Sequence, residues 1–198
     1  LHELNVPFEY IKLDMLRGEH KNPEYMKNQP FGAVPYIDDD GFILFESCAI
    51  CRYLCRKYAE RGGSALYPVD DLVAFARVEQ GISIEMTAFD EVVRAMFTEK
   101  VYKPMRGQQG SEELYQEALA KFDQKLDVYE KILGERKFIA GDVFTLADLF
   151  HIPYATRLQP ATGCDLLEKK PNVARWYKSI IARPAWQANK DGVKAIAP

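Results

Sequence analysis

Glu46 and Ser47 stand at the start of a predicted helix, directly after the apolar run Phe42–Phe45. The free amides of a helix N-terminus and the helix dipole bind carboxylates. The Ser47 hydroxyl adds a donor at this point, and the Glu46 carboxylate can hold an ammonium group. The pair therefore suits the head of an α-amino acid. A structural role also fits, in which Ser47 caps the helix and Glu46 is a solvated acid.

Val34 and Pro35 stand at the entry to a predicted hairpin. Proline has no amide for a sheet ladder, so it belongs at a sheet edge or at a strand start. An X-Pro bond can also be cis, which turns the backbone of the preceding residue outward. Val34 would then offer its N–H and C=O to a peptide-like ligand, as one more strand does. An ordinary edge proline without a ligand also fits this sequence.

His20 and Lys21 lie in a polar loop that ends before Pro23, a residue able to start a short helix. Two neighbouring side chains that can carry positive charge suit a second carboxylate. The alternative for this pair is a solvated, charged loop without a ligand.

These candidate residues need a sheet and a helix to position them. The Asp-Gly pair at Asp40 and Gly41 predicts a tight hairpin turn. Period-two alternation and apolar runs predict three strands, over Phe8–Leu13, Val34–Ile37 and Phe42–Phe45. A helix over Ala49–Tyr58 follows, with Ser47 as its expected N-cap.

Strand signals disappear beyond Asp70, and apolar residues recur at helical spacing. The predicted helices cover Val73 to about Tyr102, Glu112–Leu133, a segment opened by Thr145, Pro171–Ala182, and Ala185 to about Lys190. The expected fold is a small α+β module over residues 1–63, a linker over 64–71 and an all-helical module over 72–198. The first module has the order of the C-terminal part of a thioredoxin-like arrangement.

Composition excludes several classes of function. The chain of 198 residues is 47% hydrophobic and 28% charged, so it can bury a core and stay in solution. A net charge of −3 gives no electrostatic reason to expect nucleic acid or an anionic membrane as a partner. No apolar run approaches the roughly 20 residues of a membrane helix, and no secretion signal is visible. Three of the four cysteines lie close together on one predicted helix, which indicates a reduced, cytoplasmic protein.

Residues 2–54 resemble the N-terminal domain of a glutathione transferase. The resemblance rests on the elements GEHK, NPEY, FGAVP and FESCAI, which are most similar to the phi class and its fungal relatives. FTLADL near Thr145 is similar to the capping-box segment of the family's helical domain. Together these motifs span most of the chain in the family's order.

The resemblance implies one tripeptide site. The residues matching His20 and Lys21 hold the glycine carboxylate of glutathione. The residue matching Val34 pairs with the cysteinyl backbone, ahead of a cis-proline matching Pro35. The residues matching Glu46 and Ser47 hold the γ-glutamyl head. Ala33 departs from the family, which often has Gln or Lys there, so one possible side-chain contact is lost.

The expected activity is conjugation of the glutathione thiolate to small apolar electrophiles in detoxification, with reduction of organic hydroperoxides as a further activity. Glutathione is a co-substrate, and no cofactor or metal is expected. The resemblance also implies a homodimer. Two alternatives stay open: a non-catalytic glutathione-binding or scaffold domain of the same fold, and a thiol transferase or dehydroascorbate reductase.

The catalytic residue is not assigned to any position of this sequence. By resemblance, the phi-class Ser lies at a first strand-helix corner that would precede Leu1, and LHELNV reads as the end of a helix. Ser at that corner would support a transferase, whereas Cys would support thiol exchange through mixed disulfides.

Several other residues are given structural roles. Cys48, Cys51 and Cys55 lie near one helical stripe and are interpreted as buried or interface residues rather than metal ligands. Thr145 and Asp148 have the spacing of a capping box, and His151 is expected to be a core or groove histidine. Candidates for an apolar wall beside the electrophile are Met86, Phe89, Met96 and Phe97, and core or interface packing is the alternative for most of them.

Overall fold

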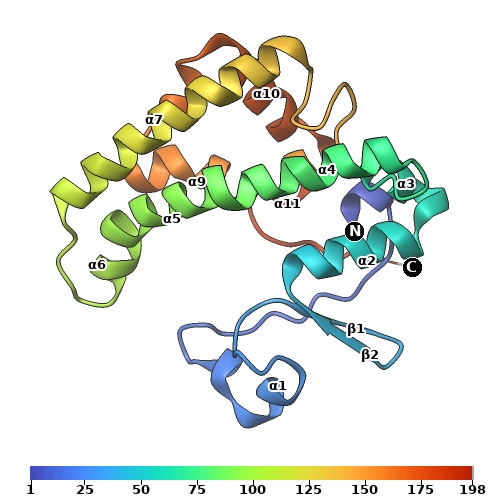
Figure 1. Ribbon diagram of the computed structural model, residues 1–198. Helices are drawn as coiled ribbons and strands as arrows, with labels where there is room; N and C mark the ends of the chain where they lie inside the picture. Colours follow the sequence, from blue (N-terminus) through green and yellow to red (C-terminus); the bar gives the residue numbers. More distant parts are fainter. Residues whose placement is uncertain (198) are drawn as a thin grey trace. The chain divides into compact units, whose positions relative to one another are not determined.

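Two antiparallel strands, β1 (Tyr36–Asp39) and β2 (Phe42–Phe45), form a hairpin in the computed structural model, which describes residues 1–197 (Figure 1). Asp40 and Gly41 have φ values of 52° and 88°, as a two-residue turn with two left-handed positions requires. The predicted Asp-Gly turn is confirmed. The first strand starts at Tyr36 rather than Val34, since Pro35 has no amide to donate to the ladder.

By clustering of contacts, the chain divides into a first unit, Leu1–Tyr67 with the segment from Ala188 onward, and a second unit, Pro68–Gln187. The helices of the first unit are η1 (His2–Leu4), η2 (Glu19–Lys21), α1 (Pro23–Asn28), α2 (Ser47–Lys57), η3 (Ala59–Arg61) and α3 (Gly63–Leu66). Its buried apolar residues include Ile50 and Leu54, which lie one turn apart on α2.

The strand predicted over Phe8–Leu13 is wrong. Only Phe8 pairs, in an isolated antiparallel bridge with Ile196, where the Phe8 N–H donates to the Ile196 carbonyl at 3.0 Å. Alternation of apolar and polar residues indicates which face a residue takes, but a strand also needs a neighbouring strand for its hydrogen bonds. Among residues 1–197, no second strand lies beside this segment.

Helices joined by loops make up the second unit. A nearly continuous run contains α4 (Leu72–Ile84), the π-helical η4 (Glu85–Asp90), α5 (Glu91–Phe97), the π-helical η5 (Thr98–Tyr102) and α6 (Lys103–Met105). It is followed by α7 (Glu112–Glu135), α8 (Leu146–Leu149), α9 (Ile152–Thr162), η6 (Leu166–Glu168), α10 (Pro171–Ile181) and α11 (Pro184–Asn189), the last of which ends within the first unit. The predicted long helix ending near Tyr102 is confirmed, with two π-helical interruptions that periodicity did not reveal.

The core of the second unit lies among α5, α7, α9 and α10 (Figure 1). Phe89 packs edge-on against Phe122 and His151, with ring centroids 5.6 Å and 4.7 Å away. On α7, the buried residues Ala118, Phe122, Leu126, Tyr129 and Leu133 recur at helical spacing, whereas at the start of the helix Tyr115 is buried and Leu114 is 48% exposed. These aromatic contacts give the helical unit its fixed packing.

The capping box of α8 forms as the sequence predicts. Thr145 accepts from the Ala147 amide, and the Asp148 carboxylate accepts from the Thr145 amide at 3.1 Å. Asp148 is fully buried and also accepts from the amide of Ile139 and from the indole N–H of Trp176, at 2.9 Å and 2.8 Å. The predicted helix start is therefore also a buried junction, at which Asp148 joins α8 to Ile139 and to Trp176 of α10.

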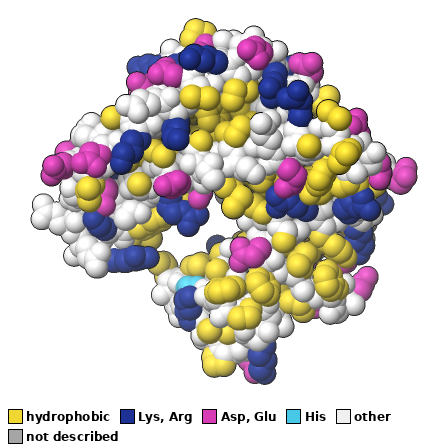
Figure 2. All heavy atoms as spheres, viewed as in Figure 1, with side chains coloured by type: hydrophobic (Ala, Val, Ile, Leu, Met, Phe, Trp, Pro, Cys, Tyr) yellow, Lys and Arg dark blue, Asp and Glu magenta, His cyan; other side chains and the backbone are white. Residues whose placement is uncertain are grey.

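Exposed apolar side chains gather on the first unit. Figure 2 shows hydrophobic atoms over the part of the chain that carries α1, β1 and β2 in Figure 1. Ile11, Leu16 and Phe31 are 76%, 95% and 71% exposed. Within residues 1–197, the helices are all too short or too polar to span a bilayer.

Candidate functional site

His20 and Lys21 lie in η2, a single helical turn that Gly18 begins at a φ of 74°. The Lys21 ammonium donates to the Phe31 carbonyl at 3.1 Å, which ties this turn to the segment leading into the hairpin. Lys21 stays exposed in this arrangement, so its charge is available to an anion.

Gly32 brings the hairpin entry against the same turn. Its φ is 56°, a left-handed value that favours glycine. A Cβ at this position would lie 2.9 Å from the His20 carbonyl oxygen and 2.8 Å from the Lys21 side chain. Only a residue without a side chain fits here, so Gly32 fixes the distance between the two predicted binding segments.

The imidazole of His20 has one ring nitrogen without a hydrogen-bond partner among the described residues. Its Nδ1 atom is buried and has no hydrogen-bond partner among the described residues. Buried polar atoms are nearly always paired with protein groups, water or a ligand. His20 can therefore take a further hydrogen-bonding group at this position.

The Val34–Pro35 peptide bond is cis, as the sequence allows. Val34 is 49% exposed, and its backbone groups make no hydrogen bond within residues 1–197. The Tyr25 hydroxyl donates to the Ala33 carbonyl at 2.6 Å and holds the segment just before this bond. Val34 thus has the free backbone that strand-like pairing with a peptide needs.

Glu46 and Ser47 lie directly across the end of the hairpin from this segment. The ladder ends at the pair Tyr36 and Phe45, so Pro35 and Glu46 are the next residues on either side. Ser47 is the first residue of α2, an 11-residue helix whose first amides have no intrahelical acceptor. Both Glu46 and Ser47 are exposed.

The N-cap prediction for Ser47 is wrong. Glu46 occupies the cap position with a φ of 69° and a ψ of 108°, and no side chain bonds to the helix amides. Local preference points to Ser as the cap. The hairpin fixes where the chain turns, however, and it places the helix start one residue earlier. The Ser47 hydroxyl is consequently not used as a cap.

Together these residues make one composite surface in the first unit. The hairpin register brings the Glu46 corner beside Val34, and Gly32 joins the His20 turn to the same segment. The surface offers positive charge at one end, free backbone groups in the middle, and a carboxylate with a helix N-terminus at the other end. These groups match a short peptide with two carboxylates and one ammonium group.

Sequence reasoning gave no role to three residues that position the site: Tyr25, Gln29 and Gly32. Gln29 is 1% exposed, and its side chain accepts from the Phe31 amide at 2.8 Å. The tyrosine and the glycine stand in the NPEY and FGAVP elements. Their contacts join residues 8 to 12 positions apart, which a local pattern does not show.

The predicted apolar wall of the second unit is largely core. Phe89, Met96 and Phe97 are each at most 1% exposed, whereas Met86 is 55% exposed. Core packing, the alternative reading of these positions, is therefore the role of the three buried residues. His151 is fully buried and lies 3.0 Å from the Tyr129 hydroxyl, as expected for a core histidine.

Two of the three cysteines of α2, Cys51 and Cys55, are poor nucleophiles. Burial raises the pKa of Cys51 to about 11 and that of Cys55 to about 12, so both thiols are protonated at neutral pH. The four cysteines form no disulfide, and no group of His, Cys, Asp and Glu within residues 1–197 is arranged to hold a metal ion.

Comparison with known protein families identifies the chain. The family profile for the glutathione S-transferase N-terminal domain matches residues 1–56, and that for the C-terminal domain matches residues 89–184. Glutathione S-transferase hmp2 from Hypomyces subiculosus is 43% identical over 188 residues, covering 94% of this chain and 88% of the relative. The protein therefore belongs to the glutathione S-transferase family.

Solved structures agree with this assignment. Glutathione transferase F2 from Populus trichocarpa has a TM-score of 0.84 and 39% identity, over 93% of this chain and 86% of that one. Glutathione S-transferase I from mais, in complex with an atrazine glutathione conjugate, has a TM-score of 0.85 and 31% identity, over 93% and 85% of the two chains. The predicted thioredoxin-like and all-helical fold and the phi-like type are confirmed.

Proposed function

We propose that this protein is an enzyme that joins the thiolate of glutathione to small apolar electrophiles. The observation that carries the proposal is the composite surface of the first unit, which offers partners for both carboxylates and the ammonium group of a γ-glutamyl tripeptide. The family's relatives are named glutathione S-transferases, and one solved relative holds a glutathione conjugate. Reduction of organic hydroperoxides by the same thiolate is a second expected reaction.

Each predicted residue has a role in the proposed complex. His20 and Lys21 bind the glycine carboxylate, and the unsatisfied Nδ1 of His20 supports this role. Val34 pairs its free backbone with the cysteinyl residue, beside the cis bond to Pro35. Glu46 and Ser47 bind the γ-glutamyl head at the start of α2.

The chemistry is activation of a thiol followed by proximity. A thiol with a pKa of about 8.5 is mostly protonated at neutral pH, so the bound sulfur needs a donor that favours the thiolate. The thiolate then attacks an electrophilic carbon, and no covalent intermediate with the enzyme forms. Glutathione is the co-substrate, and the proposed reaction uses no metal or other cofactor.

We further propose that the protein is a cytoplasmic homodimer. Free thiols in a folded chain are typical of a reducing compartment. In the proposed dimer, Cys48 on α2 faces the partner subunit. Sedimentation velocity of the wild-type protein tests the dimer, and a single species with the mass of one chain would contradict it. A dimer band on non-reducing gels after oxidation, lost in Cys48→Ser, tests the position of Cys48.

Binding and turnover together test the proposed function. We expect the full-length protein to bind glutathione in calorimetry and to turn over 1-chloro-2,4-dinitrobenzene. Binding without turnover would indicate the scaffold alternative, and transfer of electrons to dehydroascorbate or mixed disulfides would indicate the thiol-transfer alternative. Absence of glutathione binding would contradict every version of the proposed site.

Ser47→Ala tests the site itself. The Ser47 hydroxyl makes no hydrogen bond as a cap, so its removal should leave folding unchanged. Loss of a hydrogen bond to a carboxylate should raise the glutathione Kd about tenfold. Ser64→Ala is the matched control, because Ser64 is also an exposed serine at a helix start. Equal Kd values for the two variants would contradict the assignment of Ser47.

A further inference from the structure

Two cysteines lie at the start of α2, separated by two residues. The order is Cys48, Ala49, Ile50 and Cys51, and α2 begins at Ser47. Residues three positions apart on an α-helix are neighbours on its surface, with Cβ atoms about 5–6 Å apart. Two cysteines at this spacing, the first of them at a helix start, are typical of dithiols that exchange with disulfides.

The two thiols differ in their surroundings. Cys48 is half-buried and belongs to the first turn of α2, whose first amides have no intrahelical acceptor. The N-terminus of a helix favours a thiolate over a thiol. Cys51 lies almost one turn further along, and burial raises its pKa to about 11. Cys48 is therefore suited to attack a disulfide, and Cys51 is suited to react in a second step.

The first step prepares the second. Cys51 lies within electrostatic range of Cys48, and negative charge on Cys48 raises the pKa of Cys51 beyond the effect of burial. Once Cys48 is bonded to another sulfur it carries no charge, and this contribution disappears. Arg52 acts in the opposite direction and lowers the pKa of Cys51. Cys51 therefore becomes a better nucleophile at the stage when it has to react.

The start of α2 can take up the change in shape that a disulfide requires. Bonded cysteines have Cβ atoms about 3.8 Å apart, so those of Cys48 and Cys51 must approach by about 1–2 Å. The residue before the helix is not helical, since Glu46 has a φ of 69° and a ψ of 108°, and no side chain caps the helix. The first amides have no intrahelical hydrogen bonds to lose. The first turn can therefore tighten without breaking the rest of α2.

Cys55 is a poor partner for either thiol. It is 3% exposed, and burial raises its pKa to about 12. A bond between Cys51 and Cys55 would distort the middle of α2, where helical hydrogen bonds lie on both sides of the pair. The bond that the helix accommodates best joins Cys48 and Cys51.

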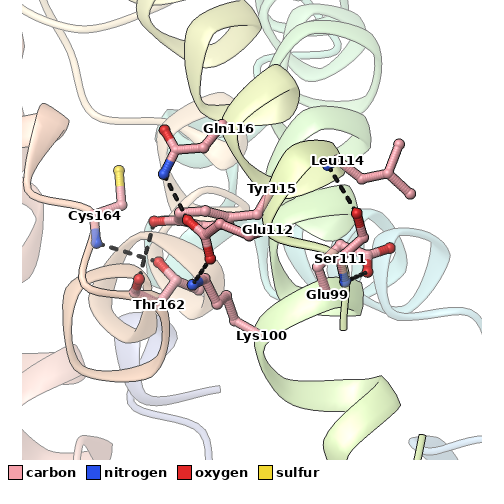
Figure 3. Close-up of polar contacts among 9 residues, drawn as sticks. All are labelled: Glu99, Lys100, Ser111, Glu112, Leu114, Tyr115, Gln116, Thr162 and Cys164. Atoms are coloured by element: carbon pink, nitrogen blue, oxygen red, sulfur yellow. Dashed lines mark hydrogen bonds and ion pairs between the residues drawn. The ribbon is translucent and has the colours of Figure 1, made fainter. Parts of the chain in front are cut away.

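The fourth cysteine provides an internal reference. Cys164 is 5% exposed and is the only cysteine among residues 68–187. Its amide donates to the Thr162 hydroxyl at 3.3 Å, and the Tyr115 hydroxyl donates to the Thr162 carbonyl at 2.9 Å (Figure 3). Cys164 thus lies in a buried, hydrogen-bonded turn without a second cysteine in its unit, and it should stay reduced.

We propose that Cys48 and Cys51 form a redox-active dithiol, which disulfides of low molecular mass, such as glutathione disulfide, convert reversibly into an intramolecular disulfide. The dithiol is a modification site of the protein, and the reaction is stoichiometric. It goes beyond the proposed transferase function and does not depend on the composite surface that is proposed to bind glutathione.

The exchange proceeds in two steps. The Cys48 thiolate attacks one sulfur of glutathione disulfide, forms a mixed disulfide and releases one glutathione thiolate. Cys51 then loses its proton to water and attacks the sulfur of Cys48, which releases the second glutathione thiolate. The two glutathione thiolates take up the two protons that the protein thiols lose. The protein is oxidised by two electrons, and one glutathione disulfide is reduced to two glutathione molecules.

The proposed dimer gives the exchange a second starting point. There Cys48 faces the partner subunit, and a bond between two Cys48 thiols presents the same sulfur to Cys51. Attack by Cys51 releases Cys48 of the partner subunit as a thiolate and leaves the intramolecular bond. After oxidation, the dimer band on non-reducing gels should therefore be stronger in Cys51→Ser than in wild type. A weaker dimer band in Cys51→Ser would contradict the role of Cys51.

Trypsin separates the dithiol from the other cysteines. The sequence has no Lys or Arg between Lys27 and Arg52, so residues 28–52 form one peptide that contains both thiols of the dithiol. The other two cysteines fall in peptides 53–56 and 158–169. A bond within the dithiol therefore stays inside one peptide, whereas any other disulfide of the chain links two peptides.

The test is oxidation of the full-length folded protein with glutathione disulfide. After an acid quench, alkylation with N-ethylmaleimide in denaturant and digestion without reductant, mass spectrometry measures each cysteine peptide. We expect the wild-type peptide 28–52 to lose two hydrogen atoms and to carry no alkyl group, while the other two cysteine peptides are alkylated. Dithiothreitol added before the quench should restore both thiols.

Three variants assign the roles. Cys51→Ser should stop after the first step, so that its peptide 28–52 keeps one glutathionyl group. Cys48→Ser should react about tenfold more slowly, because the remaining thiol is protonated. Cys55→Ser is the matched control, since it removes the third thiol of the same helix and should be oxidised like wild type. Far-UV circular dichroism before oxidation checks that each variant keeps its helices.

A lasting glutathionyl group on the wild-type peptide, or a link between peptides 28–52 and 53–56, would overturn the proposal. So would a folded wild-type protein whose dithiol stays fully alkylated under conditions that oxidise the urea-unfolded chain. Glutathione binding and turnover of 1-chloro-2,4-dinitrobenzene by the reduced protein test the transferase function separately, so failure of one proposal is distinguished from failure of the other.

Discussion

Glu85 and His151 are two buried titratable residues of the helical unit. Folding raises the pKa of Glu85 and lowers the pKa of His151. Burial raises the pKa of Glu85 from 4.5 to about 7, with a further contribution from Asp90. Burial lowers the pKa of His151 from 6.5 to about 3. Between pH 4.5 and 6.5 the folded protein keeps a proton on Glu85 that the unfolded chain loses, and it lacks a proton on His151 that the unfolded chain gains.

The two opposite pKa shifts predict opposite effects of pH on folding stability. The contribution of Glu85 to folding stability is fully present below pH 4.5 and is lost as the pH rises toward 7. The contribution of His151 is present above pH 6.5 and is lost as the pH falls toward 3. Relative to wild type, Glu85→Gln should therefore lose stability as the pH falls from 6.5 to 4.5, by up to about 1.4 kcal/mol per pH unit. His151→Asn should gain stability over the same range.

Urea unfolding followed by tryptophan fluorescence at three pH values measures both slopes. Each slope is taken as the difference from wild type, because the surface carboxylates titrate in all three proteins alike. Slopes of the same sign in the two variants would contradict the opposed shifts.

Asp148 gives a second prediction for a single residue. Its buried carboxylate accepts hydrogen bonds from the amides of Ile139 and Thr145 and from the Trp176 indole. An asparagine in its place would turn its NH₂ group, a donor, toward at least one of these N–H donors. Asp148→Asn should lower the free energy of unfolding by about 2–4 kcal/mol. Asp142→Asn makes the same chemical change at an exposed position of the preceding loop and should cost little. Similar midpoints for the two variants in chemical denaturation would refute the junction role.

In the first unit, a close backbone approach at Gly32 acts together with the side-chain contacts of Lys21 and Tyr25. Gly32 joins the turn of His20 and Lys21 to the hairpin entry, and it does so at a positive φ. Gly41, at the hairpin turn, also has a positive φ of 88° but has open space around it. Substitutions at these two glycines therefore distinguish the cost of backbone strain alone from the cost of strain together with a steric clash.

Gly32→Ala should raise the glutathione Kd more than tenfold, because the added methyl group forces the turn of Lys21 away from the hairpin entry. Gly41→Ala should carry only the backbone cost of about 1 kcal/mol and should keep glutathione affinity within about twofold. Calorimetry with glutathione measures both. Equal losses of affinity would show that strain alone, and not the contact with the turn, decides binding.

The same elements show what the sequence can and cannot predict. Asp40 and Gly41 define their turn chemically, and Thr145 and Asp148 define a helix start, so local signals suffice for both. The segment Phe8–Leu13 has the alternation of a strand, yet strand formation depends on a partner that no local pattern reveals. Ser47 has the chemistry of a cap, but the hairpin places the helix start one residue earlier.

The candidate site divides in the same way. His20, Val34 and Glu46 are visible because their residue types suit a charged peptide and because a family resemblance orders them. The roles of Tyr25 and Gln29 cannot be predicted in this way, since each depends on a hydrogen bond to the hairpin entry that only the folded chain makes. Gly32 is a similar case, because its role is the absence of a side chain next to a turn 11 residues earlier.

At the scale of the whole molecule, the C-terminal segment is part of the first unit. The Phe8 amide donates to the Ile196 carbonyl at 3.0 Å, and His2 contacts the Lys194 carbonyl at 2.7 Å. The unit that carries the proposed glutathione site is therefore built from both ends of the chain, with the helical unit between them in sequence.

Deletion of residues 193–198 should loosen the first unit and leave the helical core unchanged. The Phe8 amide loses its acceptor, so we expect its hydrogen exchange, followed by NMR, to accelerate at least tenfold. The amide of Leu126, in the buried middle of α7, should keep its rate. Deletion of residues 197–198 alone keeps the Ile196 carbonyl and is the control. Unchanged exchange at Phe8 in the longer deletion would contradict this role of the segment.

The π-helical segment η5 has a consequence for chain length. A π-helical turn holds one residue more than an α-helical turn, and each residue rotates an α-helix by about 100°. A chain one residue shorter between Phe97 and Tyr102 would form an unbroken α-helix and carry the tyrosine about 100° around the axis, away from Tyr154. A single-residue deletion, without any substitution, would thus separate the hydroxyls of Tyr102 and Tyr154, which lie 3.1 Å apart.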